Sequence, residues 1–191
     1  MSFFLGIFPP RDAIENINKV KEGVTSVFDG FEIPVRWSLP NTYHLTLIHF
    51  GESYPFYKRL TLKYKLKNIS LKGFIIRFNT VKLGISRRYK ELIYLDLLEG
   101  GDDMRKLLLE LRSVLNVKNE GNFLPHLTLG RVSKELTDQE YANICRDLTV
   151  VSKNLNIKDI RFRVNGLELV KSEEGEYQVL ISFSDFSSTS S

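Results

Sequence analysis

The chain has 191 residues, 42% of them hydrophobic, and a formal net charge of +4, so it is long enough for one folded domain or for one domain with two lobes. Its single cysteine, Cys145, excludes an internal disulfide and is typical of a reducing compartment. No apolar run approaches the ~20 residues of a membrane span, and the short apolar start at 1–8 lacks the basic n-region of a signal peptide. We therefore expect a soluble, monomeric, cytoplasmic protein without a membrane anchor.

The first half of the chain predicts alternating strands and helices, because extended apolar runs exchange with apolar residues spaced three and four apart. Proline and glycine mark the ends of these elements. In chain order, the predicted elements are a buried strand at 3–8, a helix at about 11–28, a short extended segment at 33–37, a strand at 43–50 and a helix at 55–67.

The second half predicts a similar alternation. Its elements are strands at 74–81 and 92–98, a helix with an apolar stripe at 104–115, a strand at 126–132, a helix opened by a Thr137–Glu140 capping box, an apolar alternation from 160 to 169 and a strand at 177–183. A phase shift of the apolar residues at Gly166 predicts a β-bulge. Since no linker divides the chain, we expect one bilobal α+β domain over residues 1–183 and a disordered polar tail at 184–191.

One tetrapeptide occurs twice: His44-Leu45-Thr46-Leu47 recurs letter for letter as His126-Leu127-Thr128-Leu129. Two of the chain's three histidines lie in these copies, and each copy lies in a predicted strand. Side chains on a strand alternate between faces, so the His and the Thr of each copy point one way while both Leu point into a core. Two such strands that face each other place two imidazoles and two hydroxyls around one small cavity.

Two histidines across a cavity can act as general base and general acid, because imidazole titrates near ~6.5 and both of its forms exist at neutral pH. Such a pair suits phosphodiester cleavage: one ring takes a proton from the nucleophile and the other gives one to the leaving oxygen. The two threonines would then donate hydrogen bonds to the non-bridging phosphate oxygens. A positioned acid or base contributes ~10²–10⁴-fold in rate, so loss of either histidine would be severe.

Three alternatives to acid–base catalysis by this pair stay open at this point. A shared metal site lacks an accompanying Asp, Glu or Cys at ligand spacing. The second alternative is that both histidines are buried in the core and have only a structural role. This would explain one such motif better than two identical ones. Nucleophilic catalysis by Cys145 lacks a nearby histidine, and this cysteine falls on the apolar stripe of a predicted helix, so we expect it in the core.

The third histidine, His49, follows His44 by five residues. On a regular strand this odd offset turns its side chain away from the cavity. We therefore expect His49 to be structural or exposed at an edge, and not catalytic.

Basic residues gather in the middle of the chain. Residues 53–90 contain eleven Lys and Arg and no Asp or Glu, whereas the rest contains 16 basic and all 23 acidic residues. This distribution predicts a polyanionic partner, with RNA or DNA first, in whose binding Lys63, Lys65 and Lys67 take part. A solvated lysine-rich helix face that binds nothing is the alternative.

These segments together resemble the 2H phosphoesterase superfamily, named for its two His-x-Thr/Ser motifs, and within it the RNA 2′,3′-cyclic phosphodiesterases, also called 2′-5′ RNA ligases. The resemblance extends over nearly the whole chain. It rests on the opening strand Phe3–Pro10, Arg36-Trp37 before the first motif, the block Pro125–Arg131 around the second, the closing segments Phe162-Arg163-Val164 and Leu167-Glu168-Leu169, and Tyr177. One departure is His49, which stands where the family usually has Phe.

The resemblance implies two antiparallel β-sheets that face a central cleft, with helices on the outside. It also implies hydrolysis of RNA 2′,3′-cyclic phosphate ends to 2′-phosphates without a metal or other cofactor. In this reaction His126 is the proton acceptor that activates water, and His44 is the proton donor to the departing 3′ oxygen. Thr46 and Thr128 hold the phosphate.

Three further site residues rest on the same resemblance. Arg131 is expected to contact phosphate or ribose, although the alternation of side chains on a regular strand would place it on the face opposite to that of His126. Phe8 and Pro9 are expected to line the nucleotide pocket. The partner is then an RNA with a 2′,3′-cyclic phosphate end, for which tRNA fragments are one source.

Two other functions are compatible with these residues. A non-catalytic RNA-binding module of the same fold would keep the basic region without the chemistry. Ligation of tRNA-like halves is attached to the family name, but the chain has no Gly-rich phosphate loop for ATP.

Overall fold

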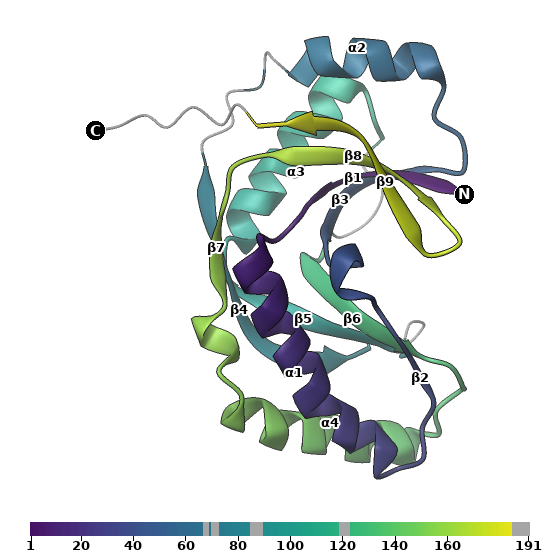
Figure 1. Ribbon diagram of the computed structural model, residues 1–191, viewed down its shortest axis with the longest axis vertical. Helices are drawn as coiled ribbons and strands as arrows, with labels where there is room; N and C mark the ends of the chain where they lie inside the picture. Colours follow the sequence, from purple (N-terminus) through teal and green to yellow (C-terminus); the bar gives the residue numbers. More distant parts are fainter. Residues whose placement is uncertain (67–68, 70–72, 85–89, 119–122, 185–191) are drawn as a thin grey trace.

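The computed structural model of the chain describes residues 1–66, 69, 73–84, 90–118 and 123–184 (Figure 1). The strands are β1 (Ser2–Ile7), β2 (Val35–Trp37), β3 (Leu45–Gly51), β4 (Phe74–Leu83), β5 (Leu92–Glu99), β6 (His126–Val132), β7 (Arg161–Val164), β8 (Leu167–Glu173) and β9 (Glu176–Phe183). The helices are α1 (Arg11–Asp29), α2 (Phe56–Leu66), α3 (Gly101–Leu115), α4 (Asp138–Asn154) and the 3₁₀-helices η1 (Pro40–Thr42) and η2 (Ile157–Asp159). Lys67 and residues 185–191 of the predicted tail lie outside the described part.

The helices begin and end where the local sequence predicts. α1 covers the predicted helix and buries its apolar stripe, and Pro10 precedes its first residue. α4 begins at the predicted capping box, in which the Thr137 hydroxyl accepts the Glu140 N–H at 3.2 Å and a Glu140 carboxylate oxygen accepts the Thr137 N–H at 2.8 Å. These bonds satisfy N–H groups that an α-helix otherwise leaves without partners.

The strands form one curled antiparallel sheet in the order β7-β4-β5-β6-β3-β1-β8-β9, with β2 paired to β6. The sheet has two halves that meet at β3 and β6. These two strands share a single register pair, Leu45 opposite Leu127, so they diverge on either side of it. The predicted antiparallel α+β fold is confirmed, but the two expected sheets are the two halves of one continuous curled sheet, joined by the pairing of β3 with β6.

The helices lie on the outer side of the curled sheet (Figure 1). α4 packs on β4 and α1 packs on α4, whereas α3 packs on β3 and β5 with α2 beyond it. The core between these layers contains the apolar residues of the strands, including both leucines of each motif. Among the described residues, no helix is long and apolar enough to cross a membrane.

Gly166 lies between two strands and not at a bulge within one strand. β7 ends at Val164 and pairs with β4, whereas β8 begins at Leu167 and pairs with β1, so the chain passes here from one half of the sheet to the other. The predicted bulge at Gly166 is therefore wrong. The apolar phase shifts because the two segments face different parts of the core.

Cys145 lies on α4, half-buried and packed against the core, as its position on the apolar stripe predicts. Burial raises the pKa of its thiol, and this disfavours the thiolate that a nucleophile needs.

Candidate active site

The two motifs meet at the junction of the two halves of the sheet. Leu45 and Leu127 are fully buried opposite each other, so their neighbours in sequence point to the other face of the sheet. His44 and Thr46 precede and follow Leu45, and His126 and Thr128 flank Leu127 in the same way. All four are half-buried on the concave side. Tertiary structure thus brings together the two histidines and two threonines that the repeat predicts.

Each histidine ring is oriented by a hydrogen bond of the same kind, from Nδ1 to the backbone carbonyl two residues earlier. The Nδ1 atom of His44 lies 2.8 Å from the carbonyl oxygen of Thr42, and Nδ1 of His126 lies 2.8 Å from that of Leu124. A carbonyl oxygen only accepts, so each Nδ1 carries a proton and donates it. The Nε2 of each neutral ring is consequently left with a free lone pair. Each ring can take a proton there or, once charged, give one.

Burial lowers the pKa of both imidazoles. Two further charges act in the same direction: a protonated His126 lowers the pKa of His44, and the guanidinium of Arg131 lowers that of His126. The bonds to the carbonyl oxygens oppose these effects in part. Because a charge on His126 disfavours a charge on His44, the two rings resist carrying a proton at the same time.

We expect this burial to make the protein less stable in acid. The unfolded chain has the ordinary His pKa of 6.5 and the folded chain a lower one, so below pH 6.5 the unfolded state binds more protons. The free energy of unfolding should therefore fall as the pH is lowered from 6.5. In a His44→Gln, His126→Gln variant, which lacks both rings, the free energy of unfolding should fall less steeply with decreasing pH. Urea unfolding at several pH values measures both slopes, and equal slopes would show that the rings are solvated in the folded state.

Aromatic side chains surround both rings. The His44 ring lies 4.5 Å from Phe4, 5.7 Å from Phe8 and 5.3 Å from Tyr177, between ring centroids. His126 lies 5.5 Å from Tyr94. These contacts hold the rings in place and exclude water, which accounts for the desolvation. Of these rings, only Phe8 was expected at the site, by resemblance. Phe4, Tyr94 and Tyr177 were not, because a continuous apolar strand gives no sign of which face lies in a cleft.

The absence of a side chain at Gly6 lets the Phe4 ring approach His44. A Cβ at Gly6 would lie 3.0 Å from the carbonyl oxygen of Leu45 and 3.3 Å from the Phe4 ring. Gly130 leaves room for the Trp37 ring against β6, since a Cβ there would lie 2.9 Å from that ring.

Arg131 reaches the same face as the motifs through a β-bulge. Thr128 lies opposite Tyr94 and Gly130 opposite Ile93, so Leu129 is an extra residue in β6. The bulge reverses the alternation and turns the half-exposed Arg131 to the side of Thr128, although a regular strand would turn it away. Arg131 also lies 3.3 Å from a carboxylate oxygen of Glu91.

His49 is on the concave face for the same reason. Thr46 lies opposite Gly6, Ile48 opposite Leu5 and His49 opposite Phe4, so Leu47 is an extra residue in β3. Since the Phe4 ring contacts His44, the exposed His49 shares the face of the site. The expectation that His49 points away is therefore wrong, because it assumed an unbroken strand.

A cavity of about 590 Å³ opens beside the second motif. It is lined by Arg36, Trp37, Ser38, Leu39, Thr42, Thr128, Gly130, Arg131, Ser172, Glu174, Gly175 and Tyr177. Burial raises the pKa of Tyr177, so its hydroxyl stays protonated and can donate a hydrogen bond. The cavity thus combines aromatic walls, a guanidinium and hydroxyl donors next to a histidine motif.

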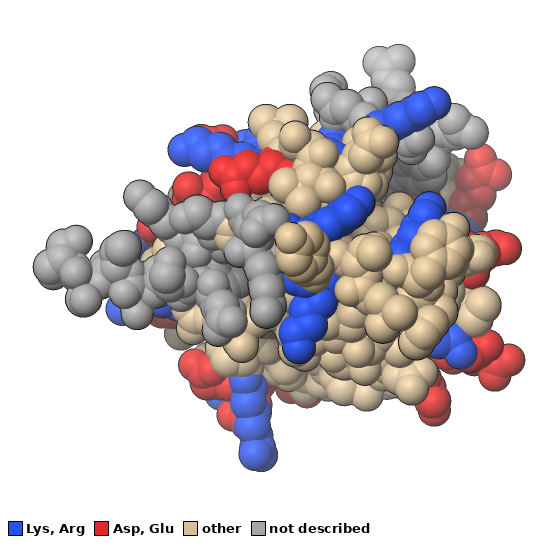
Figure 2. All heavy atoms as spheres, turned by 90° about the horizontal axis from the view of Figure 1, so that it is seen from above, with Lys and Arg blue, Asp and Glu red and all other residues tan. Residues whose placement is uncertain are grey.

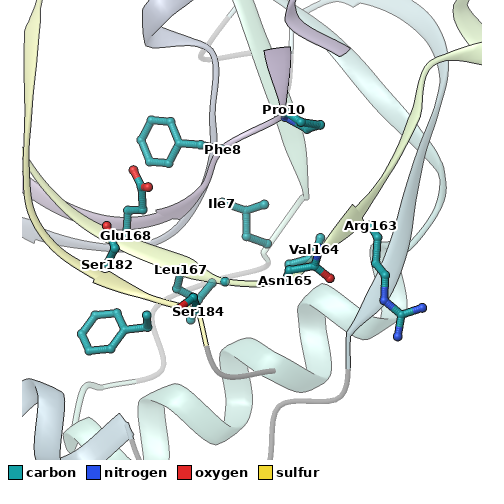
Figure 3. Close-up of a pocket in the computed structure, with 12 residues that line it drawn as sticks. Ile7, Phe8, Pro10, Arg163, Val164, Asn165, Leu167, Glu168, Ser182 and Ser184 are labelled. Carbon is teal, nitrogen blue, oxygen red and sulfur yellow. The ribbon is translucent and has the colours of Figure 1, made fainter. Parts of the chain in front are cut away.

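Phe8 lies at the edge of a second, smaller cavity of about 290 Å³ (Figure 3). In this view the carboxylate of Glu168 points toward the Phe8 ring, whereas Arg163 points away. Burial raises the pKa of Glu168. Pro9 is buried and lines neither of the two cavities. Within the described residues, no three His, Cys, Asp or Glu side chains come close enough together to hold a metal ion.

Known proteins share this fold. A model of the 2′-5′ RNA ligase superfamily matches residues 40–176. Similar solved structures include TT0787 of Thermus thermophilus, at TM-score 0.71 and 19% identity, covering 98% of this chain and 100% of that one. E. coli LigT complexed with 3′-AMP has TM-score 0.63 and 19% identity, covering 95% and 96%. Kluyveromyces marxianus Usb1 with uridine monophosphate has TM-score 0.59 and 14% identity, covering 94% and 95%. No curated protein matches the sequence significantly.

The fold and the paired motifs define the class of two-histidine (2H) phosphoesterases. The chain belongs to the 2′-5′ RNA ligase superfamily, whose model covers well over half of its length.

Proposed function

We propose that this protein hydrolyses the 2′,3′-cyclic phosphate at the end of an RNA to a 2′-phosphate, by acid–base catalysis between His44 and His126 without a metal ion. The observation that carries the proposal is the matched pair of rings. Each donates Nδ1–H to a carbonyl oxygen, so that both Nε2 atoms are available on one face beside a threonine hydroxyl.

In the proposed reaction, water attacks phosphorus opposite the 3′ oxygen. Nε2 of neutral His126 takes a proton from this water, the bond from phosphorus to the 3′ oxygen breaks, and protonated His44 gives its Nε2 proton to that oxygen. The products are a 2′-phosphate and a free 3′-hydroxyl, and proton exchange with solvent restores both rings. The hydroxyls of Thr46 and Thr128 donate to the non-bridging oxygens as negative charge develops.

The charges around the two rings support this assignment of roles. The Arg131 guanidinium lowers the pKa of His126 and so favours its neutral, proton-accepting form. Arg131 is the residue that we expect to hold the phosphate or ribose, since it lines the cavity together with Thr128. A phosphate anion bound between the rings favours the protonated form of His44. The ligands in the E. coli LigT and yeast Usb1 complexes, 3′-AMP and uridine monophosphate, are nucleotides, which supports a nucleotide substrate here.

The direct test is incubation of the pure protein with a nucleoside 2′,3′-cyclic phosphate in excess EDTA. We expect accumulation of the nucleoside 2′-monophosphate. A 3′-monophosphate would show that the 2′ oxygen leaves, and the absence of turnover on both mononucleotide and RNA substrates would favour a non-catalytic RNA-binding module.

The family name supports a second candidate reaction at the same site. If the 5′-hydroxyl of another RNA replaces water as the nucleophile, the same proton transfers join the two chains by a 2′–5′ bond. Adding an RNA such as a tRNA half with a free 5′-hydroxyl to the assay separates ligation from hydrolysis by the length of the product.

The described part of the basic region supports an RNA partner. α2 has no acidic residue, and its outer side exposes four large side chains: Phe56, Tyr57, Leu60 and Tyr64. Figure 2, seen from the α2 end, shows Lys and Arg side chains among uncharged residues. Cations that contact phosphates and rings on which bases stack are the two means by which proteins bind single-stranded RNA.

We expect a Lys63→Gln, Lys65→Gln variant to bind RNA more weakly and with a flatter salt dependence. Each phosphate contact on a single strand contributes ~0.7 to the slope of log K against log salt, so two lost contacts reduce it by about 1.4. Binding of a fluorescent oligoribonucleotide at several salt concentrations measures the slope.

The matched control is Lys153→Gln, Lys158→Gln, which removes the same charge from α4 and η2 at the opposite end of the molecule (Figure 1). An unchanged slope in the α2 variant, or an equal change in the control, would show that α2 is a solvated face with no RNA contact.

A further inference from the structure

The internal repeat extends beyond the four identical letters. From His44 to His49 and from His126 to Arg131, the residues follow one burial pattern: half-buried, buried, half-buried, buried, buried, exposed. Each strand has its extra residue at the second leucine, Leu47 or Leu129. His49 therefore occupies in the first repeat the place that Arg131 occupies in the second.

The antiparallel pairing places these two side chains on opposite sides of the motifs. β3 and β6 run in opposite directions from the shared pair Leu45–Leu127. His49 follows Leu45 by four residues, and Arg131 follows Leu127 by four. Since one of the four is an extra, bulged residue, each distance corresponds to about three steps along the strand. At ~3.3 Å per step, His49 and Arg131 lie roughly 10 Å from the shared pair, in opposite directions. The phosphate that reacts between the histidines is then flanked by a cationic side chain on one side and an imidazole on the other.

The His49 ring differs from the two motif rings in its tautomer. Its Nδ1 accepts the N–H of Gly51 at 3.2 Å, and a backbone N–H only donates. The proton of the neutral ring therefore lies on Nε2, on an exposed side chain. This ring presents a fixed N–H donor, which suits binding of a phosphate oxygen and not removal of a proton from a nucleophile.

The charges beyond each end of the site favour passage of a polyanion on the His49 side. Arg131 is paired with Glu91, and the cavity that it lines also contains Arg36 and Glu174, so two carboxylates match the two guanidinium groups at this end. Beyond His49, β3 ends at Gly51, whose partner Phe3 carries the Arg59 guanidinium 4.9 Å above its ring. One acidic residue, Glu52, follows Gly51, and α2 with its four basic and no acidic side chains comes next.

We propose that Nε2–H of His49 binds the phosphate that links the terminal nucleotide of the RNA to the one before it. This inference rests on the proposed function, since it assumes a cyclic phosphate between His44 and His126. In this arrangement the terminal nucleotide lies toward Arg131, and the 5′ part of the RNA leaves the cleft past His49 and continues around the end of β3 toward α2 on the outer side of the sheet. His49 thereby makes the protein prefer an RNA end to a free mononucleotide.

The test compares two substrates with the same terminal nucleoside: a nucleoside 2′,3′-cyclic phosphate and a dinucleotide ending in the same group. In His49→Ala we expect KM for the dinucleotide to rise roughly 3- to 10-fold, as for the loss of one hydrogen bond, with kcat unchanged. Both constants for the mononucleotide should stay as in the wild type. His49→Gln, which keeps a side-chain N–H, should recover part of the loss, and His49→Phe should not.

A neutral methylphosphonate in place of the linking phosphate makes the test specific to that group. It should raise KM of the wild type but have little further effect on His49→Ala. Equal effects of His49→Ala on both substrates, no effect on either, or full sensitivity of the variant to methylphosphonate would each overturn the inference while leaving the proposed function intact. If the wild type cleaves neither substrate, the proposed function fails and this inference fails with it.

Discussion

Replacement of His44 or of His126 by alanine is expected to lower kcat/KM for the cyclic phosphate ~10²–10⁴-fold, because each ring supplies one of the two proton transfers. The chain has only one other histidine. The remaining imidazole, His49, lies beyond the motif and donates through Nε2, whereas the motif rings offer a free Nε2. Initial rates on a nucleoside 2′,3′-cyclic phosphate in EDTA measure the loss.

The two single variants should also be strongly non-additive. The two proton transfers assist the same reaction, so once one of them is lost the other ring accelerates it little. The double variant should therefore be hardly slower than the single ones. Added imidazole should restore part of the activity to the alanine variants. Circular dichroism and thermal unfolding check that the variants remain folded. Undiminished turnover in both single variants would show that the reaction occurs elsewhere.

Replacement of Thr46 or Thr128 by valine is expected to lower kcat ~10²-fold, the lower end for removal of one preorganised donor to a developing charge. Valine has nearly the shape of threonine but no hydroxyl, so the strands should keep their register. Thr46→Ser and Thr128→Ser keep the hydroxyl and should retain most of the activity. Because the charge on the non-bridging oxygens grows toward the transition state, the loss should appear in kcat more than in KM.

Thr149→Val is the matched control for this prediction. Its hydroxyl bonds to the carbonyl oxygen of Cys145 within α4, on the outside of the sheet. This substitution should leave kcat unchanged. Equal activity of the valine and serine variants would show that the motif threonines serve packing alone.

Much of the fold could be predicted because neighbouring residues determine it. The stripe of α1, the capping box of α4 and the alternation of β3 and β6 depend on contacts within a few residues of chain. The same alternation placed His44 with Thr46 and His126 with Thr128 on one face. The convergence of the two motifs was a hypothesis from their identity, and the single pair Leu45–Leu127 supplies the contact.

Side chains point to a face other than the one that regular alternation predicts where a strand departs from regular pairing. The extra residues Leu47 and Leu129 turn His49 and Arg131 to the concave face, and the passage at Gly166 between the two halves of the sheet looks in sequence like a bulge. In each case the face to which a side chain points depends on the register between two paired strands, which the sequence of one strand does not determine. The partner's side chains and the packing beneath them decide which residue is left unpaired.

The sequence by itself thus determined the elements, the face that each motif presents and the chemistry of its side chains, because side-chain period and residue type are local properties. Only the tertiary structure decided which aromatic rings enclose the histidines, which ring nitrogen each histidine leaves free, and which side chains beyond the motifs join the site. These features depend on distant strands meeting in one register, and that register is set by the whole core.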